Sequence, residues 1–372
     1  MKITALKTRL TNVPFAKPIT TAIHDMRSVG CLLVYLETDV GLVGQSYLFT
    51  LNAVRLKAFD EMVRGFSHCI VGQDPHYVTA INSSIWAEIN PTGYAGVTIS
   101  ALSALDTACW DLVGKSADRP LHHLFGACRD RIRTYASGGL WLSQSIDELV
   151  DEAAIFLDRG FRAMKVRVGN ADPRKDFERV KAVREAVGPS IEILTDANQA
   201  LTPKQAIRLG RMLEELDIGW LEEPVSVHDL AGQAEVRNAL DMAIASGETE
   251  WTRFGIRNTI DARAADVLMP DLQRIGGLTE MRRVAALAEA YCLPISTHIF
   301  TEHSLCIAGS AANCISVEHM PWYAPLFREE MEIADGDILI PTRPGTGFTF
   351  DEAAVERFAT SKKSMSGWNY IR

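Results

Sequence analysis

The second half of the chain repeats one unit, a short apolar segment followed by an amphipathic segment with helical periodicity. The unit recurs roughly every 20 to 30 residues, the length of a strand, a helix and their connections. Short apolar runs bounded by polar residues are typical of buried parallel strands. Such runs occur at residues 133–139, 163–169, 191–198, 218–224, 242–249, 265–272, 293–299 and 314–320.

Parallel strands that alternate with helices in this number predict an α/β fold with a closed barrel, the TIM barrel. A doubly wound open sheet is the alternative, but it usually has fewer strands and a glycine-rich phosphate turn after the first. No G-x-G-x-x-G follows a predicted strand in this sequence. We therefore expect a barrel whose C-terminal strand ends carry the chemistry.

The two ends of the chain follow another pattern. The first part predicts strands and a hairpin, and residues 96–117 place apolar residues at i, i+3 and i+4, which predicts a helix. After the last predicted barrel strand, residues 336–352 predict a strand and a turn that return to the N-terminal unit. We expect an α+β domain over 1–125, the barrel over 126–325 and a returning C-terminal segment over 326–372.

Three successive predicted strands end with a carboxylate, namely Asp196, Glu222 and Glu248. Neighbouring strands lie about 4.8 Å apart, so these side chains converge at one edge of the barrel. A divalent cation relieves their mutual repulsion, and an all-oxygen set favours Mg²⁺ over Zn²⁺. We expect one Mg²⁺ per subunit here. Glu223 is the competing ligand, which points away from the barrel axis if Glu222 points in.

The other strand ends carry a candidate acid/base set. Asp271 ends the sixth strand and His298 the seventh, so the carboxylate can accept the Nδ1 proton and leave Nε2 free as a general base. Glu318 ends the eighth strand and, if protonated, could donate a hydrogen bond to a developing oxyanion. Lys165 and Arg167 share one face of the second strand, so two cations would face His298 across the barrel mouth.

Composition narrows the class of partner. The net charge of -9 argues against a nucleic-acid surface, which would need clustered Lys and Arg. The N-terminal residues lack an apolar signal region, and no apolar run reaches about 18 residues, so we expect a cytoplasmic protein without membrane contact. The seven cysteines are scattered, which favours reduced thiols over disulfides.

Together these residues resemble the enolase superfamily and, within it, the mandelate racemase subgroup, over residues 3–350. The resemblance implies a modified (β/α)7β barrel under a capping domain built from both termini, with Mg²⁺ on the three carboxylates. It also implies that a substrate carboxylate binds the metal and loses its α-proton to give an enediolate. The motifs that carry it are K-x-[KR] at Lys165, D-x-N at Asp196, E-E-P at Glu222, G-E at Glu248, P-D at Asp271, S-[ST]-H at His298 and V-E at Glu318.

Two positions depart from the racemase pattern, because Arg167 stands where a lysine is expected and Gly139 where a serine is expected. Deprotonating an arginine at pH 7 would cost roughly 7 kcal/mol or more, against roughly 4 to 5 kcal/mol for an unperturbed lysine. Arg167 therefore suits a substrate clamp, which leaves His298 as the competent base. One base can remove the α-proton and return it to a departing β-hydroxide, so we predict dehydration of an acid sugar to a 2-keto-3-deoxy acid.

Two other functions stay open. A racemase or epimerase of a 2-hydroxy acid would need Arg167 to act as a base or proton conduit. A barrel that binds metal without catalysis would serve as a binding or scaffold protein.

In every catalytic case the partner is a small-molecule carboxylate, and the resemblance implies a homo-oligomer. Contacts to the rest of the substrate are expected from the loop of His24, Asp25 and Arg27 for hydroxyls, from Ile19, Ile23 and Met26 for an apolar substituent, and from Asn198, Gly139 and Trp141 at strand ends.

Overall fold

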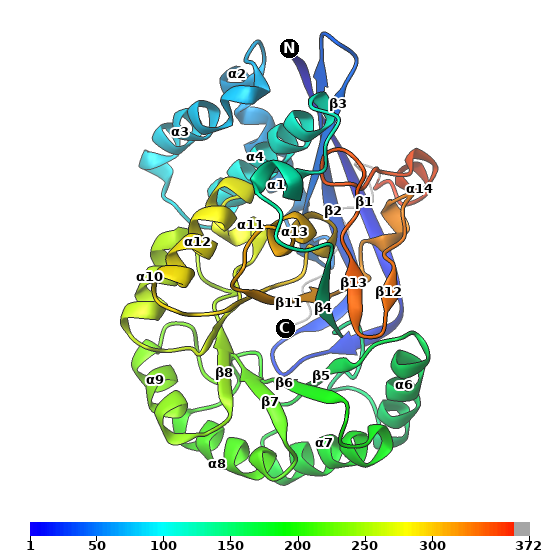
Figure 1. The fold of residues 1–372 in the computed structure, drawn as a ribbon, viewed down its shortest axis with the longest axis vertical. Coiled ribbons are helices and arrows are strands. Elements are labelled where there is room, and N and C mark those ends of the chain that lie inside the picture. Colours follow the sequence, from blue (N-terminus) through cyan, green and yellow to red (C-terminus); the bar gives the residue numbers. More distant parts are fainter. Residues whose placement is uncertain (361–372) are drawn as a thin grey trace.

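The computed structural model describes residues 1–360, and its centre is a closed barrel of parallel strands (Figure 1). Each strand pairs with the next along the chain, and the last pairs with the first, which closes the cylinder. The predicted barrel is thus confirmed, and each expected segment overlaps one strand. These strands are β4 (Arg131–Ala136), β5 (Ala163–Arg167), β6 (Glu192–Asp196), β7 (Ile218–Glu222), β8 (Ala243–Ser246), β9 (Val267–Leu268), β10 (Ile295–Thr297) and β11 (Cys314–His319).

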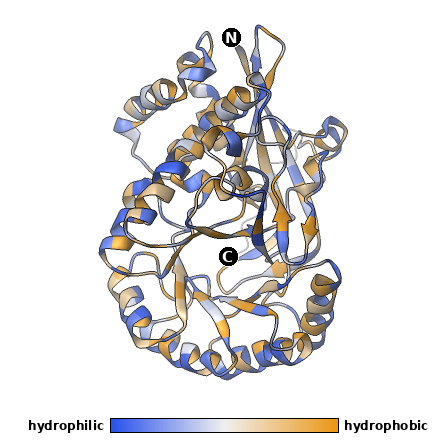
Figure 2. Ribbon diagram, viewed as in Figure 1, coloured by the Kyte–Doolittle hydropathy of each residue, from blue (hydrophilic) through white to orange (hydrophobic). Residues whose placement is uncertain are grey.

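Helices surround the barrel because each buries an apolar stripe against the strands. The N-terminus of α6 (Ile146–Asp158) carries a capping box, in which Ser145 and Glu148 each accept a hydrogen bond from the other's backbone N–H. Figure 2 shows that the helices mix hydrophobic and hydrophilic residues around their circumference. The other helices around the barrel are α7 (Pro173–Val187), α8 (Pro203–Glu214), α9 (Leu230–Ala239), α10 (Thr252–Asp261), α11 (Leu272–Ile275), α12 (Leu278–Ala290) and α13 (Thr301–Ala308).

A capping domain packs on the barrel. Its antiparallel sheet has the order β1 (Ile3–Thr20), β2 (Asp25–Thr38) and β3 (Val43–Leu51). The helix predicted at 96–117 is α4 (Val97–Ser116), which contacts β3 on one side and α11 and α12 of the barrel on the other. Shorter helices complete the domain, namely α1 (Leu56–Gly65), α2 (Ser67–Ile70), η1 (Pro75–Tyr77), α3 (Val78–Glu88), η2 (Asn90–Thr92) and α5 (Leu121–Phe125).

The C-terminal segment contacts both domains. After η3 (Ala324–Leu326), β12 (Ile333–Ala334) and β13 (Asp337–Leu339) form a hairpin, and β13 pairs antiparallel with the start of β4. This extension of the barrel sheet was not predicted.

The expected return to the cap follows the hairpin. The backbone N–H of Thr346 donates to Asp111 of α4, that of Phe350 donates to Gln45 of β3, and α14 (Glu352–Arg357) comes after them. The rest of the expected segment, 361–372, lies outside the described residues, and the boundaries 1–125, 126–325 and 326–372 stay a prediction.

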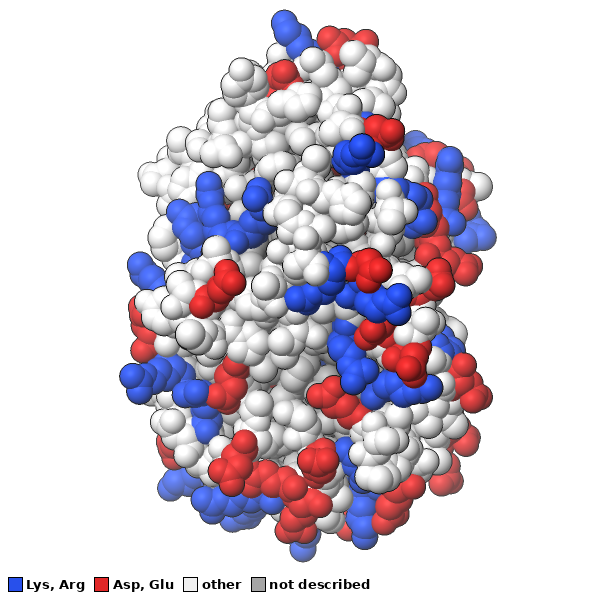
Figure 3. Space-filling view, in the orientation of Figure 1, with Lys and Arg blue, Asp and Glu red and all other residues white. Residues whose placement is uncertain are grey.

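The distribution of surface charge and the state of the cysteines agree with what the composition predicts. Positive and negative side chains are interspersed over much of the face drawn in Figure 3. All seven cysteines are free thiols, and five of them are buried. Within residues 1–360, no helix combines the length and the apolar character needed to cross a bilayer.

A buried aromatic cluster joins the cap to the barrel. The ring of Tyr47 on β3 lies 4.9 Å from that of Phe300 and 4.8 Å from that of Tyr323, centre to centre. The Tyr47 hydroxyl donates a 2.9 Å hydrogen bond to Glu302 of α13, which is only 1% exposed. Burial raises the pKa of Glu302 to about 7, although hydrogen bonds from the local backbone and Tyr47 lower it. The junction therefore holds a carboxyl group that is neutral in mildly acidic solution.

Glu302 should make the protein less stable at about pH 8 than at about pH 5. A carboxyl group whose pKa rises on folding favours the folded state below its ordinary pKa, and this contribution is lost as the pH rises through 7. The rise from 4.5 to about 7 corresponds to roughly 3 kcal/mol of unfolding free energy. Glu302→Gln mimics the neutral acid. Denaturant unfolding should show that its unfolding free energy falls by roughly 3 kcal/mol less between pH 5 and pH 8 than that of the parent chain. Equal losses in both proteins would contradict this expectation.

Candidate active site

Three carboxylates converge at the C-terminal ends of adjacent barrel strands. Asp196 ends β6, Glu222 ends β7 and Glu248 follows β8. One oxygen from each lies within 4.8 Å of the others, and each residue is 8% exposed or less. A buried all-oxygen cluster of this kind fits a hard divalent cation such as Mg²⁺. The structure thus brings together the three residues that the sequence suggested as metal ligands.

Lys165 on β5 neutralises part of this cluster. Its ammonium group lies 2.8 Å from Glu222, 2.8 Å from Glu318 and 3.6 Å from Asp196. Burial lowers the pKa of Lys165, but the attraction of Glu222 and Glu318 outweighs it and holds the pKa above its usual range. Burial raises the pKa of Glu222 well above its usual range, since one ammonium group offsets only part of the surrounding negative charge. A divalent cation would neutralise what remains.

Glu223 turns away from the cluster, as expected if Glu222 points in. Its carboxylate accepts hydrogen bonds from Gln199 at 2.9 Å and from Thr249 at 2.8 Å at the cavity rim. Burial, with repulsion from Glu248, raises the pKa of Glu223 to about 8. Its neighbours therefore satisfy Glu223 without a metal ion.

Arg167 on β5 is held from three directions. Its Nη1 lies 3.2 Å from Asp196 Oδ2, its Nη2 donates a 3.1 Å hydrogen bond to Ser137, and its guanidinium carbon lies 4.8 Å from the centre of the Trp141 ring. Burial lowers the pKa of Arg167, but Asp196 and Glu318 raise it above its usual range. A guanidinium group fixed in this way stays charged and can only donate hydrogen bonds.

His298 and Asp271 form the expected pair. The Nδ1–H of His298 donates a 2.7 Å hydrogen bond to one oxygen of Asp271, whose other oxygen accepts from the backbone N–H of Arg274 at the start of α11. The Nε2 atom lies 3.2 Å from Glu248 and 3.8 Å from Glu318. Burial lowers the pKa of His298, but these carboxylates raise it above its ordinary value. Asp271 thus sets the orientation of the imidazole.

Glu318 differs from the protonated acid that the sequence suggested. Its oxygens accept hydrogen bonds from Ser137 and from the backbone N–H of Ile299, and one pairs with Lys165. Burial raises the pKa of Glu318, but nearby cations, Lys165 foremost, bring it below its usual range. The contacts of Glu318 therefore favour a carboxylate that accepts hydrogen bonds and orients Lys165 over a protonated donor. Ser137, which links Glu318 to Arg167, was not singled out because nothing local distinguishes it from any strand serine.

The three expected substrate contacts differ in position. Asn198 lines the cavity, but its backbone N–H and side-chain amide both donate to Asp196, so it also orients that carboxylate. His24 lines the cavity from the loop between β1 and β2, and partial burial lowers its pKa. Ile23 lines the cavity as well, although 51% of the residue is exposed.

Gly139, the second departure from the racemase pattern, has a packing explanation. A Cβ atom at this position would lie 2.5 Å from Glu152 and 2.7 Å from Phe156, so a serine here would require these side chains to shift. Of the other positions considered from the sequence, Met26 and Trp141 line the cavity, whereas Ile19, Asp25, Arg27 and Gly139 do not.

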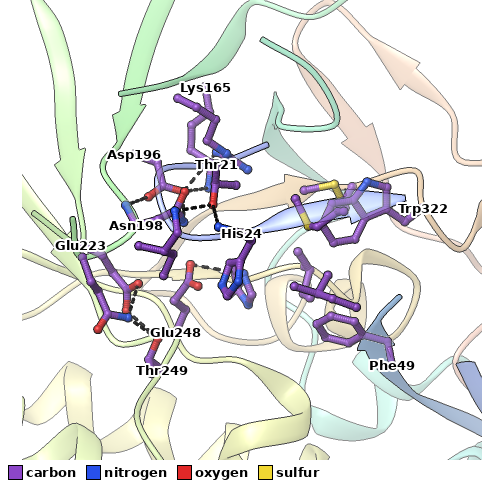
Figure 4. Close-up of a pocket in the computed structure, with 18 of the residues that line it drawn as sticks. Thr21, His24, Phe49, Lys165, Asp196, Asn198, Glu223, Glu248, Thr249 and Trp322 are labelled. Atoms are coloured by element: carbon purple, nitrogen blue, oxygen red, sulfur yellow. Dashed lines mark hydrogen bonds and ion pairs between the residues drawn. The ribbon is translucent and has the colours of Figure 1, made fainter. Parts of the chain in front are cut away.

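The cavity has a volume of about 420 Å³ and two unlike sides (Figure 4). Glu223 and Glu248 lie on one side and Phe49 and Trp322 on the other, with His24 between them. Phe49 belongs to β3 of the cap and Trp322 follows β11, so both domains build the apolar side. Further lining residues that the sequence did not suggest are Thr21, Thr50, Leu51, Gln199, Thr249, Gln273, Arg274, Ile299 and Met320.

Only some of these lining residues left a signal in the sequence. Gln273 and Arg274 follow the predicted sixth strand directly, and a position just after a barrel strand could have identified them. Thr50 and Leu51 of the cap left no such signal, because their approach to the cavity depends on how the two domains pack.

The chain matches known families over most of its length. Residues 3–126 match the mandelate racemase / muconate lactonizing enzyme N-terminal domain, and residues 148–354 match the enolase C-terminal domain-like family. The sequence is 34% identical to 3,6-anhydro-alpha-L-galactonate cycloisomerase of Streptomyces coelicolor, over 96% of this chain and 99% of that protein. It is 30% identical to L-talarate/galactarate dehydratase of Salmonella typhimurium, over 92% of this chain and 86% of that protein.

Comparison of structures leads to the same group. The crystal structure of the Salmonella L-talarate/galactarate dehydratase liganded with Mg and L-lyxarohydroxamate has a TM-score of 0.93 and 29% identity, covering 97% of this chain and 93% of that one. Sequence and fold thus lead to the same relatives. The chain therefore belongs to the mandelate racemase / muconate lactonizing enzyme family of the enolase superfamily.

Proposed function

We propose that the protein is a Mg²⁺-dependent dehydratase that converts an acid sugar to a 2-keto-3-deoxy acid. The observation that carries this proposal is the difference between the two groups that could exchange a proton with C2 of the substrate. One is the imidazole of His298, oriented by Asp271, and the other is the guanidinium of Arg167, held by Asp196 and Ser137. Only the imidazole exchanges a proton readily near neutral pH, and a single base suits elimination.

Asp196, Glu222 and Glu248 would hold Mg²⁺, which supplies positive charge to the substrate carboxylate as its α-proton leaves. Lys165 adds a fixed positive charge beside them. Arg167 would bind the substrate carboxylate or a hydroxyl. Its Nη1 atom is paired with Asp196, but its Nε atom is buried and makes no hydrogen bond within residues 1–360, so Nε is the donor left for a ligand.

His298 serves both proton transfers. Its Nε2 takes the proton from C2, and the electrons of the C–H bond pass to the substrate carboxylate to give the enediolate. These electrons then form the C2–C3 double bond as the C3–O bond breaks. The same Nε2 then protonates the departing hydroxide, so water leaves and the enol product tautomerises to the 2-keto acid. Asp271 keeps Nε2 as the acceptor and stabilises the imidazolium between the two steps.

Proton NMR in D₂O would test this reaction, with Mg²⁺ and a panel of acid sugars, their lactones and anhydro forms, lactate and both mandelate enantiomers. We expect one acid sugar to lose its α-proton signal and to gain the signals of a 3-deoxy methylene group. A chelator should abolish the change and added Mg²⁺ should restore it. Loss of the α-proton signal without a methylene product would contradict dehydration.

A second function, a racemase or epimerase of a 2-hydroxy acid, is favoured by the apolar side of the cavity. Phe49, Trp322, Met26 and Met320 offer no hydrogen-bond donor to match several hydroxyls except the indole N–H, whereas they suit an apolar substituent. Deuterium exchange from both enantiomers of one acid, with the carbon skeleton intact, would establish this function. Exchange from only one enantiomer would exclude it, because racemisation requires proton transfer on both faces of C2.

A further inference from the structure

Three side chains with metal-binding chemistry meet on the cap, in residues that the proposed reaction does not use. His68 and Cys69 lie in α2 and Glu88 ends α3, in a part of the cap far from the barrel helix α8 (Figure 1). The Nε2 atom of His68 is 2.7 Å from Glu88 Oε2. The sulfur of Cys69 is 3.2 Å from the same oxygen and 3.4 Å from the same nitrogen. One nitrogen, one sulfur and one oxygen thus converge on a single point.

The backbone determines which nitrogen of His68 faces the other two residues. Nδ1 lies 3.0 Å from the carbonyl oxygen of Gly65, which can only accept a hydrogen bond, so Nδ1 donates to the backbone and Nε2 faces Cys69 and Glu88. Histidines that bind metals usually donate their other N–H to an acceptor in the same way. The His68 ring is therefore already in the orientation that a metal ligand needs.

The cluster lacks the arrangement of a nucleophilic triad. In a triad the acid holds one ring nitrogen and the nucleophile contacts the other. Here Glu88 and Cys69 both contact Nε2, and Nδ1 is occupied by the backbone. A metal ion requires ligand atoms that point at one position, and the nitrogen, sulfur and oxygen atoms of this cluster do so.

We propose that His68, Cys69 and Glu88 form a second metal site, which takes Zn²⁺. Imidazole nitrogen, thiolate sulfur and carboxylate oxygen are the ligands of zinc, whereas Mg²⁺ prefers oxygen ligands alone. On binding, the thiol proton and the proton between His68 Nε2 and Glu88 pass to solvent, and the charges of the thiolate and the carboxylate balance the +2 of the ion. The protein would thus hold two sites of different selectivity, one for Mg²⁺ in the barrel and one for Zn²⁺ on the cap.

The distances between the three atoms are close to those around zinc. Zinc bonds of about 2.0 to 2.3 Å at tetrahedral angles place ligand atoms about 3.3 to 3.6 Å apart. The two distances from sulfur, 3.2 and 3.4 Å, already approach this range, and only the 2.7 Å distance from His68 to Glu88 has to widen. The side chains of His68 and Glu88 are 63% and 42% exposed, so they can move apart and leave the fourth position to water.

Titration of the full chain with Co²⁺, as a probe for Zn²⁺, would test the site while excess Mg²⁺ occupies the barrel carboxylates. Cobalt bound to a thiolate has a sulfur-to-metal charge-transfer absorption that oxygen ligands do not produce. We expect one such band, saturating at one equivalent and removed by Zn²⁺. It should disappear in Cys69→Ser and persist in Cys292→Ser, a matched control at an exposed cysteine. His68→Asn and Glu88→Gln should weaken binding by roughly tenfold or more.

Three results would each overturn the second site. The first is the absence of a charge-transfer band in the parent chain, and the second is a band that survives in Cys69→Ser. Because Cys69 is buried, the exposed positions His68 and Glu88 provide variants that keep the cap folded, and unchanged affinity in both would also overturn it. α-Proton exchange in the Mg²⁺-loaded protein should be unchanged in all these variants, so this test does not depend on the proposed reaction.

Discussion

Replacing His298 with Asn is expected to slow α-proton exchange by roughly a hundred- to ten-thousand-fold, the usual contribution of a positioned general base. The asparagine amide can still donate a hydrogen bond to Asp271, but it has no atom that accepts a proton near neutral pH. The metal-site carboxylates stay in place, so Mg²⁺ binding should persist. Exchange is measured by NMR in D₂O on the substrate that the panel identifies, and Mg²⁺ binding by calorimetry.

His228→Asn is the matched control, since His228 is exposed on the loop after β7 and does not line the cavity. It should exchange the α-proton at the rate of the parent chain. Full activity of His298→Asn would remove His298 from the role of base. Equal loss in both variants would point instead to a general effect of removing a histidine.

Replacing Lys165 with Met is expected to lower the unfolding free energy by roughly 3 to 5 kcal/mol in the absence of Mg²⁺, the cost of removing one partner from a buried ion pair. Lys165 is 1% exposed and lies within 3.6 Å of Asp196, Glu222 and Glu318. Methionine fills much of the same space but leaves these carboxylates without their cation. Millimolar Mg²⁺ should restore part of the loss, because the ion brings positive charge to the same cluster. α-Proton exchange should fall as well, since a fixed charge beside the substrate is lost.

Denaturant unfolding without Mg²⁺ measures the loss of stability, and unfolding with Mg²⁺ measures how much of this loss the ion restores. Lys181→Met on α7 is the control. Lys181 is half-exposed, and its ammonium group lies 3.9 Å from Glu185. A surface pair of this kind is worth at most about 1 kcal/mol. A loss below about 1 kcal/mol for Lys165→Met would mean that the buried carboxylates are protonated and do not need a cation. The charge of these carboxylates would then no longer be a reason to expect a metal ion.

The sequence by itself determined the barrel strands and the charged groups at their ends. Side chains two residues apart on a strand share a face, so Lys165 and Arg167 could be placed together, and both are buried at the cavity. Parallel pairing then aligns Arg167 with Asp196, and Asp196 with Glu222. These relations depend on short-range periodicity and on the regular spacing of strands, which a single sequence displays.

Only the tertiary structure decided which distant groups meet and in which state. Phe49 and Trp322 form one side of the cavity although they come from opposite ends of the chain, and Ser137 links Arg167 to Glu318. The same contacts shift the acidity of Glu318, because burial raises its pKa while Lys165 and other cations bring it below its usual range. The position of a residue within a strand follows from its nearest neighbours. Its partners across a cavity follow from the packing of whole domains, and no local pattern encodes that.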